Sequence, residues 1–164
     1  MKASCLKQTL IPGTSRLFSD YLYNFDRVAG FYSWDAFSPE SYAGAARQIR
    51  YPSERRERLM GVLGKQNPGS ESLQVLARPE TVAVVTGQQV GLFSGPAYTI
   101  YKALTAARLA RRLTEQGLPA VPVFWLATED HDLAEVDHAW TFGSDSKPWK
   151  LTAKCEPTQG PAGP

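Results

Sequence analysis

The sequence predicts an α/β protein whose core is a βαβ unit with two parallel strands. Two short runs, TVAVVT (81–86) and LPAVPVFWLA (118–127), are rich in apolar and β-branched residues, which is typical of strands buried on both faces. Between them lie a glycine-containing turn and a segment with helical periodicity. A strand, a helix and a second strand in this order form a crossover that is almost always right-handed and joins parallel strands.

The segment between the strands, AYTIYKALTAARLARRLTEQG, predicts a helix that ends at Gly117. The apolar side chains expected to face the sheet are Ile100, Ala103, Leu104, Ala107 and Ala110. The charged side chains on the opposite side are Arg108, Arg112 and Glu115. The small alanine side chains would let the helix lie close to the sheet. Phe124 and Trp125, in the second strand, are expected in the core.

Residues 1–80 predict a partly helical, partly irregular lead-in that packs on the core. Its aromatic stretch, DYLYNFDRVAGFYSWDAF, has no sustained period, whereas SERRERLMGVLGKQ predicts a helix capped by Ser53 with Leu59, Val62 and Leu63 as an apolar stripe. Residues 81–154 are expected to form the first part of the core, in which HAWTF and PWKLTA add two strands around the turn GSDSK. Residues 155–164, rich in proline and glycine, predict a disordered tail.

Composition and charge exclude several classes of protein. The net charge is +2 and the basic residues are spread along the chain, so no nucleic-acid partner is expected. The start of the chain lacks the apolar centre of a signal peptide, and no apolar run is long enough to span a membrane. Cys5 and Cys155 stand alone, without a CxxC motif. These features predict a cytoplasmic protein.

The first candidate site is the loop that follows the first strand, TGQQVGLFSGPAYTIYK. Its glycines would let the backbone approach a ligand, and free N–H groups at the start of the next helix would favour an anion. The predicted substrate-binding residues are Gly87, Gln88, Gln89, Gly91, Gly95, Pro96, Tyr98 and Lys102. No Lys-Ser or Lys-Thr follows Gly95, so the motif is not a P-loop. The alternative is an ordinary glycine-rich turn in which Tyr98 and Tyr101 serve packing.

The second candidate site is EDHDLAEVDH, which follows the second strand directly. Its predicted catalytic residues are Glu129, Asp130, His131 and Asp132, because a carboxylate beside an imidazole can orient it as a general base. If the segment is helical, a metal site formed by His131, Glu135 and His138 is a second possibility. A third is that the carboxylates only solvate the edge of the sheet. In an open parallel sheet both candidate sites are expected at the rim where the strands end.

The two motifs TGQQVGLFSGPAYTIYK and VPVFWLATEDHDLAEVDH resemble the N-terminal signatures of the cysteine-adding enzyme family of bacillithiol synthesis, the BshC family. The resemblance is strong over residues 81–142 and looser before them. It implies a Rossmann-like core with part of its parallel sheet present here. It also implies a ligase that joins cysteine to the amine of glucosaminyl-malate through an amide bond, and pairing of two copies through a long coiled coil that this chain lacks.

The resemblance leaves the activity of this chain open. Family members are much longer, so we expect the chain to be the front part of a longer protein and inactive alone. In the expected mechanism, the loop and Lys102 hold an anionic group while His131 and a neighbouring carboxylate deprotonate the attacking amine. ATP or another nucleotide would activate the cysteine carboxyl, although no HxGH motif is present. The rival hypotheses are a metal-dependent hydrolase and a non-catalytic remnant.

Overall fold

The fold is described from a computed structural model over residues 4–128 and 137–153. By its internal contacts the chain divides into two units, Met1–Arg50 and Tyr51–Pro164. The division predicted at residue 80 stays a prediction, and the predicted disordered tail lies outside the described residues.

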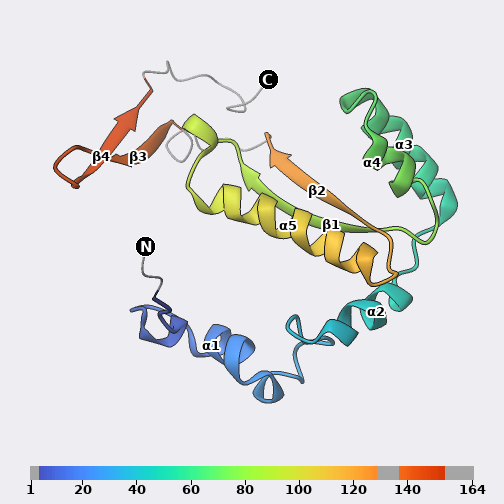
Figure 1. Ribbon diagram of the computed structural model, residues 1–164, viewed down its shortest axis with the longest axis horizontal. Helices are drawn as coiled ribbons and strands as arrows, with labels where there is room; N and C mark the ends of the chain where they lie inside the picture. Colours follow the sequence, from blue (N-terminus) through green and yellow to red (C-terminus); the bar gives the residue numbers. More distant parts are fainter. Residues whose placement is uncertain (1–3, 129–136, 154–164) are drawn as a thin grey trace. The chain divides into compact units, whose positions relative to one another are not determined.

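The first unit consists of short helices joined by turns. Its elements in order are η1 (Gln8–Leu10), α1 (Arg16–Tyr23), η2 (Phe25–Arg27) and α2 (Pro39–Gln48) (Figure 1). α1 begins after Ser15, whose Oγ accepts a hydrogen bond from the Phe18 N–H at 3.2 Å. The buried carboxylate of Asp20 accepts hydrogen bonds from Asn24 Nδ2 at 3.2 Å and Arg27 Nη1 at 3.4 Å. A polar cluster therefore fixes the turn between α1 and η2.

The start of α2 follows the usual chemistry of a helix N-terminus. Pro39 is its first residue, where a missing N–H costs nothing. Ser38 Oγ donates a hydrogen bond to Glu40 Oε2 at 2.7 Å, and this bond, together with a backbone hydrogen bond, holds the pKa of the Glu40 carboxyl below its ordinary value. The aromatic side chains before α2 are only partly packed, since Phe31 and Phe37 are 80% and 64% exposed.

The second unit contains the predicted βαβ core. Its elements in order are α3 (Ser53–Gln66), α4 (Glu71–Leu76), β1 (Val82–Gln89), η3 (Leu92–Ser94), α5 (Tyr98–Glu115), β2 (Ala120–Ala127), β3 (His138–Phe142) and β4 (Pro148–Thr152). β1 and β2 pair in parallel, from Val82 opposite Ala120 to Gln89 opposite Ala127, and α5 crosses between them (Figure 1). The predicted parallel pair and its crossover helix are confirmed.

The core of this unit lies at the end of the sheet where the strands begin. α5 packs on both strands, and α4 packs on β2. The buried apolar side chains here are Leu76, Ala106, Ala110, Leu113 and Val121. Of the predicted stripe of α5, Ala110 is buried, Ala107 is exposed, and Ile100 and Leu104 are 57% and 53% exposed. Ala106 and Leu113, which were not part of the predicted stripe, are also buried.

The prediction that both strands are buried on both faces was also wrong for the described residues. From Val82 to Val85 the residues of β1 alternate between half-buried and exposed, and Val85 is 63% exposed. In β2, Trp125 is 59% exposed, so it does not lie in the core as expected. α5 packs on both strands and α4 packs on β2, and this packing leaves Val85 and Trp125 largely exposed.

α3 and α4 are tied to the start of the sheet by Arg56. Its guanidinium donates hydrogen bonds to the carbonyl oxygens of Leu76 at 2.6 Å, Thr81 at 3.2 Å and Pro79 at 3.3 Å. The predicted cap at Ser53 was wrong: Pro52 is the N-cap and Ser53 is already the first helical residue. α3 has no buried residue, so its predicted apolar stripe is not a core face.

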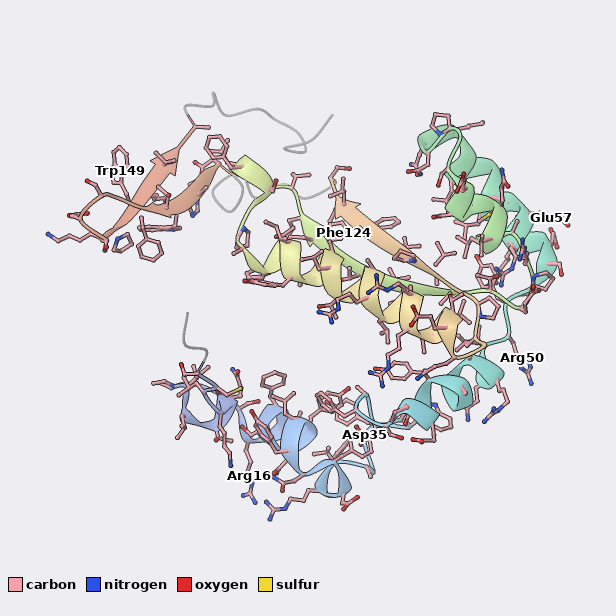
Figure 2. The ribbon with its side chains drawn as sticks, viewed as in Figure 1. Arg16, Asp35, Arg50, Glu57, Phe124 and Trp149 are labelled. Atoms are coloured by element: carbon pink, nitrogen blue, oxygen red, sulfur yellow. The ribbon has the colours of Figure 1, made fainter. Side chains whose placement is uncertain are left out.

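The last described elements confirm the two further strands. β3 and β4 form an antiparallel hairpin, with His138 opposite Thr152 and Phe142 opposite Pro148, as a sheet separate from β1 and β2. Trp149 of β4 is 63% exposed (Figure 2). Within the described ranges, none of the helices has the length and apolar character needed to cross a membrane.

Candidate functional site

The two core strands end at the same level, which places the loop after β1 and the end of β2 at one rim. The last residues of the strands, Gln89 and Ala127, are register partners. α5 begins at Tyr98, so its N-terminal turn lies after the same loop. In parallel sheets this rim is where ligands bind.

The glutamine pair belongs to the strand and not to the loop, which corrects the predicted boundary. β1 continues through Gly87, Gln88 and Gln89. Gly87 is required there because a Cβ at this position would lie 2.7 Å from the carbonyl oxygen of Trp125 and 3.0 Å from its Cβ. A glycine inside a strand often marks such a close approach, and the sequence alone does not reveal the neighbouring strand that causes it.

The loop between β1 and α5 is tightly folded. A Cβ on Gly91 would lie 3.0 Å from the Cα of Gly95, so two of the predicted glycines lie against each other. Gly95 has a φ of 70°, and Phe93 and Ser94 adopt φ values of 52° and 72°. Left-handed backbone at non-glycine residues costs about 1–3 kcal/mol each and is concentrated at functional sites. The Pro96 carbonyl accepts a hydrogen bond from the Thr99 N–H at 2.9 Å at the start of α5.

Lys102 reaches back from α5 to the end of β1. Its Nζ donates hydrogen bonds to the Gly87 carbonyl at 3.2 Å and to Gln88 Oε1 at 2.8 Å. It also lies 5.2 Å from the centre of the Tyr98 ring, within the range of a cation–π contact. Gln88 Nε2 donates in turn to Gln89 Oε1 at 3.1 Å. The ammonium group therefore contacts three of the predicted substrate-binding residues.

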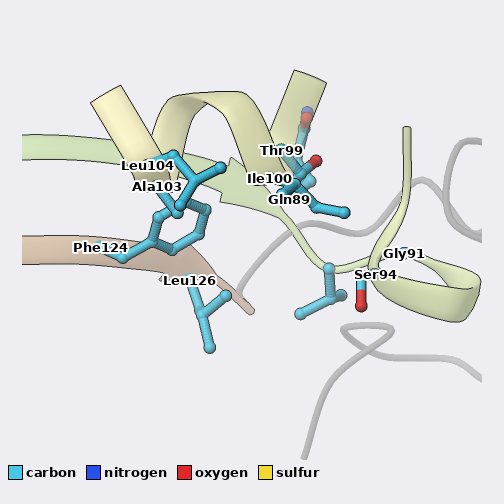
Figure 3. Close-up of a pocket in the computed structure, with 10 residues that line it drawn as sticks. Gln89, Gly91, Ser94, Thr99, Ile100, Ala103, Leu104, Phe124 and Leu126 are labelled. Atoms are coloured by element: carbon cyan, nitrogen blue, oxygen red, sulfur yellow. The ribbon is translucent and has the colours of Figure 1, made fainter. Parts of the chain in front are cut away.

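A pocket of about 460 Å³ opens beside this network (Figure 3). The residues that line it are Gln89, Val90, Gly91, Ser94, Thr99, Ile100, Ala103, Leu104, Phe124 and Leu126. Its wall is mostly apolar, with Phe124 of β2 facing Ala103 and Leu104 of α5 in Figure 3. Within the described part of the chain, Thr99 Oγ1 is buried without a hydrogen-bond partner. A few polar groups around an apolar hollow are typical of small-molecule sites.

Gln89 and Gly91 are the predicted substrate-binding residues that line this pocket, whereas Ser94, Thr99 and the apolar wall were not predicted. Ile100 and Leu104 were expected to face the sheet along the whole helix, and Phe124 was expected in the core. All three line the pocket instead. Their position in the sequence could have indicated the pocket, because Phe124 and Leu126 lie in the last half of β2, close to the rim. Their apolar character alone does not separate a pocket wall from a core.

Of the second candidate site, EDHDLAEVDH, the structure describes only the last two residues, Asp137 and His138. Glu129, Asp130, His131, Asp132 and Glu135 lie outside the described residues, so their predicted roles stay predictions. His138 is the first residue of β3, and its Nδ1 lies 3.0 Å from Asp137 Oδ1. In the described ranges no group of three or more His, Cys, Asp or Glu side chains is arranged to hold a metal ion.

Comparison with known proteins gives the family. The model of the family described as "Bacillithiol biosynthesis BshC, N-terminal Rossmann-like domain" matches residues 1–162. The chain belongs to this family. A protein of Solibacter usitatus (strain Ellin6076), named "Putative cysteine ligase BshC", is 52% identical over 163 residues, which cover 99% of this chain and 31% of the relative.

Other BshC relatives show the same pattern of coverage. A protein with the same name from Koribacter versatilis (strain Ellin345) is 40% identical over 166 residues, covering 98% of this chain and 31% of that protein. One from Symbiobacterium thermophilum is 44% identical over 126 residues, which are 71% of this chain and 23% of that protein. The chain thus spans about a third of the length of its more fully matched BshC relatives, and its Rossmann-like core is that of the family's N-terminal domain.

Proposed function

We propose that this chain contributes the N-terminal substrate-binding region of a cysteine ligase in bacillithiol biosynthesis. The full reaction would join the carboxyl group of cysteine to the amine of glucosaminyl-malate. The observation that carries this proposal is the rim pocket beside Gln88, Gln89 and Lys102, in a chain whose relatives bear the name of a cysteine ligase. Both proposed substrates carry carboxylate groups, which suit amide donors and a positive charge at one rim.

The chemistry requires an activated carboxyl group and a neutral amine. A nucleoside triphosphate is the class of co-substrate that we propose for activation, because it converts a carboxyl oxygen into a leaving group. The amine nitrogen then forms a bond to the carboxyl carbon, and the bond from that carbon to the leaving group breaks. His131, with a neighbouring carboxylate from Glu129, Asp130 or Asp132, would accept the proton lost by the amine.

The proposal assigns different tasks to the polar and apolar side chains around the pocket. The end of β1 holds an anionic part of a substrate through Gln88, Gln89 and the charge of Lys102. The apolar wall formed by Ile100, Phe124 and neighbouring side chains excludes water from the bound group.

A chimera tests this proposal within an intact protein. Residues 1–162 would replace the matching part of the Solibacter usitatus relative, and mass spectrometry would follow formation of bacillithiol from cysteine and glucosaminyl-malate. We expect an active chimera that His131→Ala slows by about 10²–10⁴-fold, the usual contribution of a general base. Arg108→Met, on exposed α5 surface, serves as the matched control and should retain activity. An active chimera that is indifferent to His131→Ala contradicts the assigned role.

A further inference from the structure

The side of the pocket formed by α5 and β2 is an apolar wall. Its residues are Ile100, Ala103 and Leu104 from α5 and Phe124 and Leu126 from β2 (Figure 3). None of these side chains carries a nitrogen or oxygen atom. Thr99 also lines the pocket, but its Oγ1 is buried, so its hydroxyl is not open to a ligand. Among the described residues, this wall offers a bound group contacts with carbon atoms and no side-chain hydrogen bond.

The other end of the pocket is polar. Gly91 and the exposed Ser94 line it from the loop after β1 (Figure 3). The ammonium group of Lys102 lies beside the pocket, 2.8 Å from Gln88 Oε1 and 3.2 Å from the Gly87 carbonyl oxygen. A ligand that fills the pocket therefore meets an apolar wall at one end and polar groups at the other. Such a ligand needs a small apolar part joined directly to charged or polar groups.

The two substrates of the proposed ligase differ in this respect. Glucosaminyl-malate carries hydroxyl, amine and carboxylate groups over its whole length, and placing such groups against an apolar wall without partners is costly. Cysteine has a small apolar end, because a thiol behaves as a small hydrophobic group with a weak donor. The thiol is mostly uncharged at neutral pH, since its ordinary pKa is about 8.5. The chemistry of the wall therefore favours cysteine over the sugar.

We propose that the apolar wall binds the side chain of cysteine and selects it against serine. This inference rests on the proposed function and assigns one of its two substrates to named side chains. The pocket, about 460 Å³ in volume, is large enough for the whole amino acid, so the ammonium and carboxylate groups of cysteine lie at its polar end. The carboxyl carbon is then next to the rim at which the attacking amine is held.

Serine differs from cysteine by one atom, and the wall distinguishes the two side chains. The serine hydroxyl forms strong hydrogen bonds in water and would lose them against Phe124 and Leu126. A buried hydroxyl without a partner weakens binding by about tenfold to a hundredfold. In L-2-aminobutyrate a methyl group replaces the thiol, and this ligand keeps the apolar contacts. A site that recognised the thiol through a polar contact or a metal ion would instead bind cysteine far better than L-2-aminobutyrate.

The test measures equilibrium binding to the chain without turnover. L-cysteine with a reductant, L-serine and L-2-aminobutyrate are titrated separately while NMR follows the methyl groups of Leu104 and Leu126. The probe variant is Ala103→Leu, whose larger side chain enters the pocket from α5 on the side that faces Phe124 (Figure 3). The matched control is Ala107→Leu, the same substitution about one turn further along α5 at an exposed position. Circular dichroism melts establish that both variants are folded.

We expect L-cysteine and L-2-aminobutyrate to shift the Leu104 and Leu126 methyl resonances and to bind within about threefold of each other. L-serine should bind at least about tenfold more weakly. Ala103→Leu should weaken binding of L-cysteine by about tenfold or more, because the added atoms occupy the space of the ligand. Ala107→Leu should stay within about twofold, as is usual for a surface substitution.

Three results would overturn the inference: equal binding of serine and cysteine, much weaker binding of L-2-aminobutyrate, or no shift at the apolar wall on addition of cysteine. These comparisons use the unsubstituted chain, so they stand even if Ala103→Leu does not fold. Selective binding of cysteine together with an inactive chimera would contradict the proposed function alone. An active chimera together with no selectivity at the wall would contradict this inference alone.

Discussion

The close contact between the two core strands at Gly87 makes a quantitative prediction. In Gly87→Ala the added Cβ would lie 2.7 Å from the Trp125 carbonyl oxygen and 3.0 Å from the Trp125 Cβ. Because the carbonyl belongs to the backbone of β2, the strands must separate. Overpacking of this kind costs about 1–3 kcal/mol. The smaller conformational freedom of alanine in the unfolded chain offsets about 0.4–1 kcal/mol of that cost.

We therefore expect Gly87→Ala to lower the free energy of unfolding by about 1–2 kcal/mol, the difference between these two effects. For a chain of this size that corresponds to a fall in Tm of about 3–6 °C. Circular dichroism during heating and urea unfolding measures both quantities. Gly61→Ala is the matched control, because Gly61 lies inside α3 with no atom within 4 Å of an added Cβ. The control should gain about 0.5–1 kcal/mol from helix propensity. Equal changes in the two variants would refute the strand contact.

Three other perturbations test separate parts of the structure. Arg56→Met should lower the free energy of unfolding, measured by urea titration, by about 1–2 kcal/mol, because three backbone carbonyls lose a charged donor. The control Arg55→Met, on the same helix, should change it by less than about 0.5 kcal/mol. Ser38→Ala should raise the pKa of Glu40 toward its ordinary value in an NMR titration. Because its pKa is lowered on folding, the Glu40 carboxylate stabilises the first unit at pH values above its unfolded pKa, and this contribution is lost as the pH falls through the folded pKa. An unchanged titration midpoint of Glu40 in Ser38→Ala would contradict the assigned hydrogen bond. A chelator should leave the melting curve of the purified chain unchanged, whereas stoichiometric tightly bound zinc or manganese would favour the hydrolase hypothesis.

The fold of the core was predictable because its strongest signals are local. Two apolar runs separated by a helix of suitable length allow few arrangements other than a parallel crossover. The exact sheet-facing side of α5 was not predictable in the same way. Ala103, Leu104, Ala106 and Ala107 place small or apolar side chains around much of the helix, so only the position of the sheet decides which of them is buried.

Of the polar side chains that line the pocket, the sequence pointed to Gln89 and not to Ser94 or Thr99, and it did not predict the shape of the pocket. Consecutive glutamines at the end of an apolar run are unusual, and this pattern marked Gln88, which contacts Lys102, and Gln89, which contacts Gln88. The end of β1 was misplaced because glycine normally weakens a strand, and the tight approach of Trp125 that requires Gly87 is a contact between distant segments. For the same reason, the sequence did not separate Phe124 from the core residues of β2.

Exposed apolar surface in the described part of the sheet bears on the expected stability. Val85, Trp125 and Leu126 are 63%, 59% and 59% exposed, which is unusual for residues of core strands. We therefore expect the chain alone to be marginally stable or prone to association. A cooperative melt of a monomer at several protein concentrations would contradict it.

The most direct measurement of the central claim is a map of backbone amide shifts on addition of glucosaminyl-malate to the chain. If the rim where β1 and β2 end holds the substrate, the largest shifts lie between Gln89 and Lys102 and at Thr128, and those in α3 stay small. Shifts concentrated in α3 or in the hairpin of β3 and β4, with the rim unchanged, would contradict the account.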